Sequence, residues 1–400
     1  MGLNDVAYAE RLHIGFFGMR NAGKSSLVNA VTGQDLCVVS DVKGTTTDPV
    51  TKAMELLPLG PVVIIDTPGL DDEGELGSLR VAKAKQILGK TDIAILVIDA
   101  LIGMSDADAL ILQELESRKI PHIIAFNKAD RLNERTPLTD NSMYVSAVSK
   151  EGIEDLKNRL GTFAKEKKNN KVIVSDLIKR GDIVVLVTPI DESAPKGRLI
   201  LPQQMTLREI LDAHATAVVC QPEEIPETLE KLNNNVKLVI TDSQVFGKVA
   251  KCIPKSIPLT SFSILMARYK GELSALVQGF AALSSLKDGD KVLISEGCTH
   301  HRQCNDIGTV KMPRWIETFS RVKPQFCFTS GGDFPEDLSV YKVIVHCGGC
   351  MLNETEMKRR ITIAEGQGIP IVNYGIAIAG MNGILRRSLE PFEDVITLLD

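Results

Sequence analysis

The chain has 400 residues, which suggests about two to four domains, and 44% of them are hydrophobic, which provides ample material for buried cores. A formal net charge of -5 and an aromatic content of 4% argue against a nucleic-acid partner, because nucleic-acid sites are basic and use stacking rings. Met1–Glu10 lacks an apolar run, and no stretch approaches the roughly 18 apolar residues of a membrane helix. We therefore expect a cytoplasmic protein with no membrane partner.

The first region of the chain alternates short apolar runs with helical stretches, a pattern typical of βαβ units around a mostly parallel sheet. The apolar runs are Ile14–Phe17, Val62–Ile65, Ile93–Ile98 and Ile120–Phe126. The polar, charged segment Lys165–Lys171 has no apolar periodicity and predicts a linker. We assign residues 1–168 to a first α/β domain.

Two more α/β domains are predicted downstream. Residues 172–262 repeat the alternation of apolar runs and amphipathic segments but carry no catalytic motif that we recognise. Residues 263–400 open with a helix predicted near Ser263–Leu283 and a strand at Lys291–Ser295. This third domain holds five of the eight cysteines, namely Cys298, Cys304, Cys327, Cys347 and Cys350. In a cytosolic chain, cysteines indicate metal binding or buried thiols rather than disulfides.

The segment Gly18-Met-Arg-Asn-Ala-Gly23-Lys24-Ser25 fits the pattern of a phosphate-binding loop (P-loop). It follows a predicted strand and precedes a helical pattern that starts at Ser26, so backbone N–H groups and the helix N-terminus can surround phosphates. Gly23, Lys24, Ser25 and Ser26 are therefore candidate nucleotide-binding residues. We expect Lys24 to reach the β- and γ-phosphates and the Ser25 hydroxyl to bind magnesium.

Two further segments supply a magnesium and γ-phosphate site. Asp66-Thr-Pro-Gly69 ends the second apolar run, where Asp66 can hold the magnesium shell and the Gly69 amide can sense the γ-phosphate. Gly44-Thr-Thr-Thr-Asp48 lies between this segment and the P-loop, and Thr46, with Thr45 in reserve, is the candidate that binds magnesium when GTP is present. Together with Lys24, these three residues, Thr46, Asp66 and Gly69, form the predicted catalytic set.

Guanine recognition is predicted at the end of the fourth apolar run. Asn127, Lys128 and Asp130 belong to the string Asn-Lys-Ala-Asp, and the Asp130 carboxylate can accept from guanine N1 and N2 together, a donor pair that adenine lacks. Ser146 and Ala147 stand where a second base-contacting loop is expected. Four motifs in the correct order at strand ends therefore predict a GTP-binding protein of the P-loop class.

A second candidate site, for a metal, lies in the third domain. Cys347 and Cys350 follow an apolar strand with two glycines between them, and His346 precedes them. Cys298 and His300 follow another strand and can point the same way, because residues i and i+2 of an extended segment share a face. Three or four Cys/His ligands fit structural zinc as well as an iron–sulfur cluster, so both stay open on the residues alone.

The nucleotide motifs resemble those of the translation-factor-like GTPases related to Era and MnmE. This resemblance implies that Asn21 helps to bind a potassium ion and that potassium stimulates hydrolysis. Leu70 stands where Ras-like proteins carry the glutamine that orients water, and an apolar side chain cannot orient water. Slow GTP hydrolysis to GDP and phosphate is therefore expected.

Cys298-x-His300 and His346-Cys347-x-x-Cys350, separated by the residues 301–345, together with an Era-like domain, resemble the HydF family of [FeFe]-hydrogenase maturation GTPases. The resemblance covers essentially the whole chain and implies that Cys298, Cys347 and Cys350 bind a [4Fe–4S] cluster. It makes His300 and His346 candidates for a fourth ligand or for hydrogen bonds beside the cluster.

The resemblance also implies the partners and the cargo. Two radical-SAM maturases would make a precursor of a di-iron subcluster, and the protein, a homodimer through its middle domain, would carry this transient precursor to the [FeFe]-hydrogenase apoprotein. The chain has no Cys-x-x-x-Cys-x-x-Cys motif for S-adenosylmethionine chemistry, which agrees with a carrier role. Two alternatives remain: a GTPase of RNA modification or ribosome assembly with structural zinc, and a redox protein using Cys347 and Cys350 as a dithiol.

Overall fold

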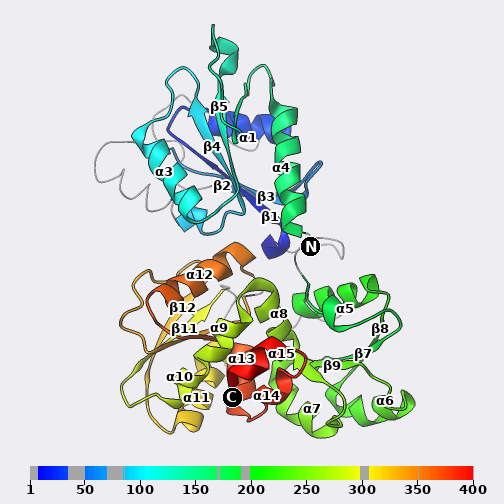
Figure 1. The fold of residues 1–400 in the computed structure, drawn as a ribbon. Helices are drawn as coiled ribbons and strands as arrows, with labels where there is room; N and C mark the ends of the chain where they lie inside the picture. Colours follow the sequence, from blue (N-terminus) through cyan, green and yellow to red (C-terminus); the bar gives the residue numbers. More distant parts are fainter. Residues whose placement is uncertain are drawn as a thin grey trace. The chain divides into compact units, whose positions relative to one another are not determined.

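The computed structural model describes residues 8–34, 50–69, 84, 86–168, 172–190, 199–297, 306–349 and 351–399. The chain divides into two compact units, Met1–Asn170 and Lys171–Asp400 (Figure 1). Among the helices formed by these residues, none has the length and apolar character that crossing a membrane requires.

The first unit is built on a six-stranded sheet with the order β2-β3-β1-β4-β5-β6. Among the described strands of this sheet, the β2–β3 pair alone is antiparallel, so the prediction of a mostly parallel sheet is confirmed. The predicted apolar runs lie in four of these strands, which pair side by side as β3-β1-β4-β5. The strands are β1 (Leu12–Phe17), β2 (Val50–Leu56), β3 (Gly60–Asp66), β4 (Ile93–Asp99), β5 (His122–Asn127) and β6 (Ser142–Tyr144).

Helices cover both faces of this sheet, as expected for strands that are apolar throughout. On one face α1 (Lys24–Thr32) and α4 (Ile153–Lys168) pack against β1, β3 and β4 through a buried cluster that includes Leu27 and Leu156. On the other face α3 (Asp106–Ser117) contributes Ile111 to a second buried cluster. The carboxyl ends of the parallel strands, where ligands bind in open α/β sheets, remain the edge from which the predicted nucleotide loops emerge.

The second unit contains two four-stranded sheets, and every strand pair in them is parallel. The first sheet has the order β10-β9-β7-β8 and the second has the order β12-β11-β13-β14. The strands are β7 (Ile183–Val187), β8 (Thr216–Cys220), β9 (Leu238–Thr241), β10 (Leu259–Ser261), β11 (Lys291–Glu296), β12 (Gln325–Ser330), β13 (Val343–His346) and β14 (Ile371–Asn373).

Three helices, α8 (Phe262–Lys270), α9 (Leu273–Gly279) and α13 (Tyr374–Met381), lie between the two sheets (Figure 1). One continuous buried cluster joins Leu186 and Ile240 of the first sheet to Ile294 and Val345 of the second. The two sheets therefore share a core, and the domain limits 172–262 and 263–400 stay a prediction. The remaining helices are α5 (Leu201–Asp212), α6 (Ile225–Lys231), α7 (Phe246–Cys252), α10 (Ala281–Ser284), α11 (Met312–Ser320), α12 (Glu354–Gly366), α14 (Leu385–Ser388) and α15 (Glu393–Ile396).

The single helix expected near Ser263–Leu283 is wrong in detail, because the structure forms three helices, α8, α9 and α10, over this stretch. Helix α8 ends at Lys270, and the N–H of the next residue, Gly271, donates to the carbonyl of Ala267. An added Cβ at Gly271 would lie 2.9 Å from Ile361 Cδ1 and 3.0 Å from the carbonyl oxygen of Ala267, so glycine allows close packing at this turn.

Candidate functional site

The P-loop joins β1 to α1, and its two glycines have positive φ angles of 138° at Gly18 and 89° at Gly23. A Cβ added to Gly18 would lie 2.1 Å from the carbonyl oxygen of Val97, and one added to Gly23 would lie 2.3 Å from Asn127 Nδ2. Both positions therefore require glycine for conformation and for space. The loop brings backbone N–H groups to the N-terminus of α1, as a phosphate site needs.

Lys24 is buried at the centre of this loop, and its Nζ donates to the carbonyls of Gly18 at 3.0 Å and Met19 at 2.9 Å. Burial lowers the pKa of Lys24 to about 8, although the carboxylates of Asp66 and Asp108 favour its charged form. Phosphate charges beside this ammonium would raise that pKa again. The protonation of Lys24 should therefore increase when an anionic ligand binds beside it.

Two of the predicted magnesium donors, Ser25 and Asp66, lie within the described residues. The Ser25 hydroxyl donates to Asp66 Oδ2 at 2.6 Å, and Asp66 is 1% exposed. Asp66 Oδ1 has no hydrogen-bond partner within the described part of the chain, which leaves a buried carboxylate oxygen available. Hydroxyl and carboxylate oxygens are the ligands that magnesium prefers, so the pair fits this ion. Thr46 and its reserve Thr45 lie outside the described residues.

Gly69 packs directly on the P-loop. A Cβ added at Gly69 would lie 2.7 Å from Arg20 Cα, so no larger residue fits at this position. The segment is anchored two residues earlier, where the Thr67 hydroxyl donates to the carbonyl of Phe16 at 2.6 Å. The Gly69 amide is therefore held beside the loop that surrounds the phosphates, whereas Leu70 lies outside the described residues.

Asn127 joins the P-loop to the second base loop. Its Nδ2 donates to the carbonyl of Ala22 at 2.9 Å, and its Oδ1 accepts from the N–H of Ala147 at 3.1 Å. Asn127 is 2% exposed, so its role is to hold the two loops together rather than to touch solvent. The structure thereby brings the predicted phosphate and guanine segments into one site.

Asp130, the carboxylate predicted to contact guanine, is exposed and is held in place by a neighbouring hydroxyl. The Ser146 hydroxyl donates to Asp130 Oδ1 at 2.6 Å, and Lys128 Nζ lies 2.6 Å from Asp99 Oδ2. We did not predict Asp99 from the sequence, although it ends the β4 run as Asn127 ends the β5 run. That shared position was the signal that could have revealed it.

Two further predicted nucleotide-binding residues, Asn21 and Ser26, are at least partly exposed to solvent. Asn21 has a left-handed φ of 62°, which asparagine tolerates better than most residues, and its side chain is exposed. Ser26 lies half-buried in the first turn of α1. The assignment of Asn21 to potassium stays a prediction.

In the second unit, one predicted cluster ligand is described in full. Cys347 Sγ accepts from the N–H of Gly297 at 3.0 Å and from the N–H of Gly349 at 3.4 Å. The Cys347 N–H donates to the carbonyl of Ser295 on β11 at 2.9 Å, which ties the ends of two neighbouring strands. Three other predicted ligands lie outside the described residues: Cys298, His300 and Cys350.

This setting fits a metal-bound thiolate. Two N–H donors to one sulfur favour its anionic form, the form that binds metals. Gly297 and Gly349 immediately precede Cys298 and Cys350 in the chain, so both ligand-bearing segments start from residues that contact Cys347. The part of the chain that the structure describes contains no group of three His, Cys, Asp or Glu able to hold a metal.

His346 is fully buried beside Cys347, and both of its ring nitrogens have partners. Arg360 Nη1 lies 3.0 Å from His346 Nε2, and His346 Nδ1 lies 2.7 Å from the carbonyl of Cys347. Because a guanidinium can only donate, Nε2 accepts and Nδ1 carries the proton. In this structure the imidazole is thus neutral and engaged through both nitrogens.

Arg360 belongs to a buried ionic network that the sequence did not predict. It is fully buried, and its Nε donates to Glu356 Oε1 at 2.8 Å. Burial raises the pKa of Glu356, but the guanidinium groups of Arg359 and Arg360 outweigh burial and hold that pKa below its ordinary value. Arg360 also donates to Ser295 Oγ at 3.3 Å, so the network spans β11, β13 and α12.

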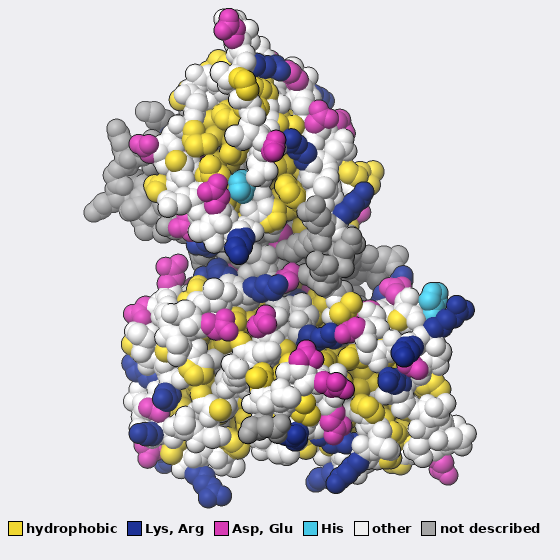
Figure 2. Space-filling model, viewed as in Figure 1, with side chains coloured by type: hydrophobic (Ala, Val, Ile, Leu, Met, Phe, Trp, Pro, Cys, Tyr) yellow, Lys and Arg dark blue, Asp and Glu magenta, His cyan; other side chains and the backbone are white. Residues whose placement is uncertain are grey.

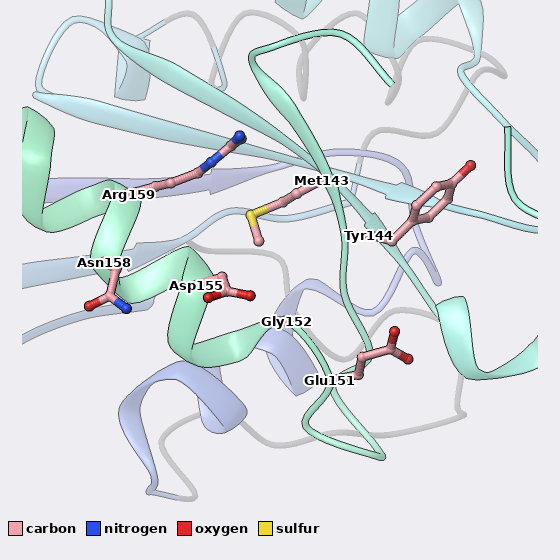
Figure 3. Close-up of a pocket in the computed structure, with 7 residues that line it drawn as sticks. All are labelled: Met143, Tyr144, Glu151, Gly152, Asp155, Asn158 and Arg159. Atoms are coloured by element: carbon pink, nitrogen blue, oxygen red, sulfur yellow. The ribbon is translucent and has the colours of Figure 1, made fainter. Parts of the chain in front are cut away.

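A separate pocket of about 500 Å³ lies beside β6 and the N-terminal half of α4 (Figure 3). It is lined by Met143, Tyr144, Glu151, Gly152, Asp155, Asn158 and Arg159. None of these lining residues belongs to the predicted nucleotide set, and Glu151 is paired with Arg135 at 2.6 Å. The pocket therefore adds nothing to the nucleotide site.

Comparisons with known proteins agree with this geometry. A family model described as a 50S ribosome-binding GTPase matches residues 13–128. The hydrogen maturase F dimerization domain matches residues 173–271, and the hydrogen maturase F tetramerization domain matches residues 274–391. The fold and the nucleotide site define a P-loop GTPase that binds GTP or GDP with magnesium. Because the two maturase models together cover more than half of it, the chain belongs to the hydrogen maturase F (HydF) family.

Two curated relatives each match about a third of the chain. GTPase Der from Kosmotoga olearia is 38% identical over 131 residues, which cover 32% of this chain and 29% of that protein. The tRNA modification GTPase MnmE from Xanthomonas oryzae is 38% identical over 157 residues, covering 38% of this chain and 34% of that protein. The chain thus spans about a third of the length of these curated relatives.

Solved structures resemble the chain more loosely. An Era variant from Aquifex aeolicus bound to GDP and aluminium fluoride is 20% identical with a TM-score of 0.35, covering 55% of this chain and 97% of that chain. A probable GTP-binding protein, engB, is 24% identical with a TM-score of 0.32, covering 38% of this chain and 99% of that chain. The assignment rests on the family models and the site.

Proposed function

We propose that this HydF-type GTPase is a scaffold that binds a [4Fe–4S] cluster and delivers a di-iron subcluster precursor to [FeFe]-hydrogenase. The observation that carries this proposal is the meeting of Gly297 and Gly349 on Cys347 Sγ, because the next residue in each segment is a predicted cluster ligand, Cys298 or Cys350. The two maturase domain models support the biological setting.

The chain's own residues would prepare the cluster site in two ways. The N–H groups of Gly297 and Gly349 favour the thiolate of Cys347. His346 donates from Nδ1 to the carbonyl of Cys347, and with Nε2 held by Arg360 it suits a hydrogen-bonding role, which leaves His300 as the candidate for a fourth ligand. When bound through three cysteines, the cluster would supply one iron with an exchangeable coordination position.

The remaining parts of the proposal concern the switch and the partners. Potassium held with the help of Asn21 would stimulate slow GTP hydrolysis. Two radical-SAM maturases would supply the precursor, and the hydrogenase apoprotein would receive it in the cytoplasm. We propose domain limits of 1–168, 172–262 and 263–400, with homodimerisation through the middle domain, in agreement with the name of the model that matches 173–271.

The test is the metal content and electron paramagnetic resonance (EPR) spectrum of the full chain purified without oxygen and then reduced. About four irons and four sulfides per chain, with a reduced-cluster signal that Cys298→Ala abolishes, would support the scaffold. One zinc per chain and no iron after anaerobic reconstitution would contradict it. That outcome would favour the alternative, an Era- or MnmE-like GTPase of RNA modification or ribosome assembly with a structural zinc site.

A further inference from the structure

A buried lysine contacts the turn between Gly349 and Leu352. Lys270 is the last residue of α8 and is 2% exposed. Its Nζ donates to the carbonyl of Leu352 at 3.0 Å and to that of Gly349 at 3.4 Å. A lysine side chain is seldom this buried unless its ammonium group is paired with polar or charged groups. These two carbonyls stand on either side of Cys350 in the chain, so the lysine holds both ends of the turn.

The same turn also packs against Gly297, the residue before Cys298. The Leu352 N–H donates to the carbonyl of Gly349 at 3.0 Å, which closes the turn. A Cβ added to Gly297 would lie 2.6 Å from Leu352 Cγ, so the Leu352 side chain packs directly on Gly297. A continuous line of contacts thus runs from Lys270 through Leu352 to Gly297, whose N–H donates to Cys347 Sγ.

The charge on Lys270 matters as well as its hydrogen bonds. An ammonium in a buried setting acts through a lower effective dielectric than in water, so its attraction for nearby anions is strong. A cluster with three thiolate ligands is anionic and gains negative charge on reduction. With a cluster bound at the cysteines, a positive charge held at this turn would therefore favour the reduced form.

We propose that Lys270 is a positioning residue that holds the cysteine turn for metal binding and favours the reduced state of the cluster. Lys270 belongs to the segment matched by the dimerization model, whereas the turn belongs to the segment matched by the tetramerization model. Lys270 thereby links these two parts of the chain. The redox half of this inference rests on the proposed cluster function.

The test compares Lys270→Met, which removes the charge at similar length, with Lys270→Arg, which keeps it. In the full chain reconstituted without oxygen, we expect Lys270→Met to lower the ratio of reduced to oxidised cluster at a fixed potential about tenfold, equal to about 59 mV for a one-electron couple. Lys270→Arg should recover most of the ratio. Lys358→Met is the matched control, because Lys358 is an exposed lysine that pairs with Glu354 on α12.

A second readout uses cobalt(II) on the metal-free chain, because thiolate ligation of cobalt is visible in its absorption spectrum. Lys270→Met should weaken cobalt affinity at least tenfold, and Lys358→Met should leave it unchanged. If wild type binds cobalt but never iron, the scaffold proposal fails while the cobalt comparison still tests the turn.

Three results would overturn the role of Lys270. The first is an unchanged ratio and unchanged cobalt affinity in Lys270→Met. The second is an equal effect of Lys358→Met, which would reflect net charge alone. The third is loss of metal from both Lys270 variants together with a lower melting temperature, which would make the lysine a packing residue. Loss of iron from Lys270→Met with recovery in Lys270→Arg would support the proposal.

Discussion

The nucleotide site and the cysteine site are built in different ways. Around the nucleotide, each functional group stands at or just after the carboxyl end of a strand, and backbone shape does much of the work, as Gly18, Gly23 and Gly69 illustrate. Around Cys347, buried charged side chains hold the site. Arg360 donates to His346, and Lys270 donates to the carbonyl of Leu352. In the first kind of site, strand ends mark the functional groups, whereas the second depends on contacts between buried charged side chains and the cysteine segment.

This contrast has a consequence for how the two sites respond to change. The two sites belong to different compact units, each with its own core. A substitution at one site should therefore leave the intrinsic chemistry of the other intact.

On the face drawn in Figure 2, positive and negative side chains are interspersed over the second unit.

The largest expected effect tests this separation directly. Cys347→Ala should abolish cluster binding, because it removes the thiolate that two N–H groups stabilise. The rate of GTP hydrolysis by the same preparation should stay within about twofold of wild type, since truncations away from a reacting centre remove no transition-state contact. Iron analysis and a phosphate-release assay measure the two quantities. Simultaneous loss of both activities would mean that the sites are not separable.

The next largest effect concerns guanine. Asp130→Ala should weaken GDP binding about 100-fold, because it removes charge-assisted hydrogen bonds to the base. Ser146→Ala should cost about tenfold, since Ser146 only orients Asp130 through its hydroxyl. Titration with a fluorescent GDP analogue measures both affinities, and Asp140→Ala, at an exposed aspartate of the same region, is the control. An unchanged affinity in Asp130→Ala would contradict the guanine assignment.

The sequence indicated the neighbours of the nucleotide residues more readily than those of the cysteine residues, for a physical reason. Asp66 and Asn127 could be assigned because each ends an apolar run, and strand ends of a parallel sheet converge. Arg360 and Ser295 are in contact although they are 65 residues apart in sequence, and Lys270 and Leu352 are 82 residues apart. No local sequence pattern could therefore predict either pair. Likewise, a continuous helical pattern concealed the turn at Gly271, which packing against Ile361 requires.

A smaller effect is expected from monovalent ions. GTP hydrolysis should be several-fold faster in potassium chloride than in sodium chloride, if a bound potassium ion supplies positive charge that the apolar Leu70 cannot replace. Asn21→Ala should remove the difference between the two salts without abolishing hydrolysis. Asn141→Ala, at an exposed asparagine of the same unit, should keep the difference. Equal wild-type rates in both salts would refute the assignment of Asn21.

The smallest effect is a proton taken up when nucleotide binds. Burial lowers the pKa of Lys24 to about 8, so part of the free chain holds this lysine neutral at slightly alkaline pH. Phosphates favour the charged form, and nucleotide binding should therefore take up a fraction of a proton above about pH 8 and weaken as pH rises further. The sign for folding is opposite: a lowered lysine pKa reduces stability at neutral pH, and this cost fades as pH rises toward the ordinary value of 10.5. Calorimetry of GDP binding in two buffers of different ionisation enthalpy measures the uptake, and Lys24→Met should abolish it. Proton release in place of uptake would contradict the buried, partly neutral state of this lysine and, with it, the view that the nucleotide site is prepared before its ligand arrives.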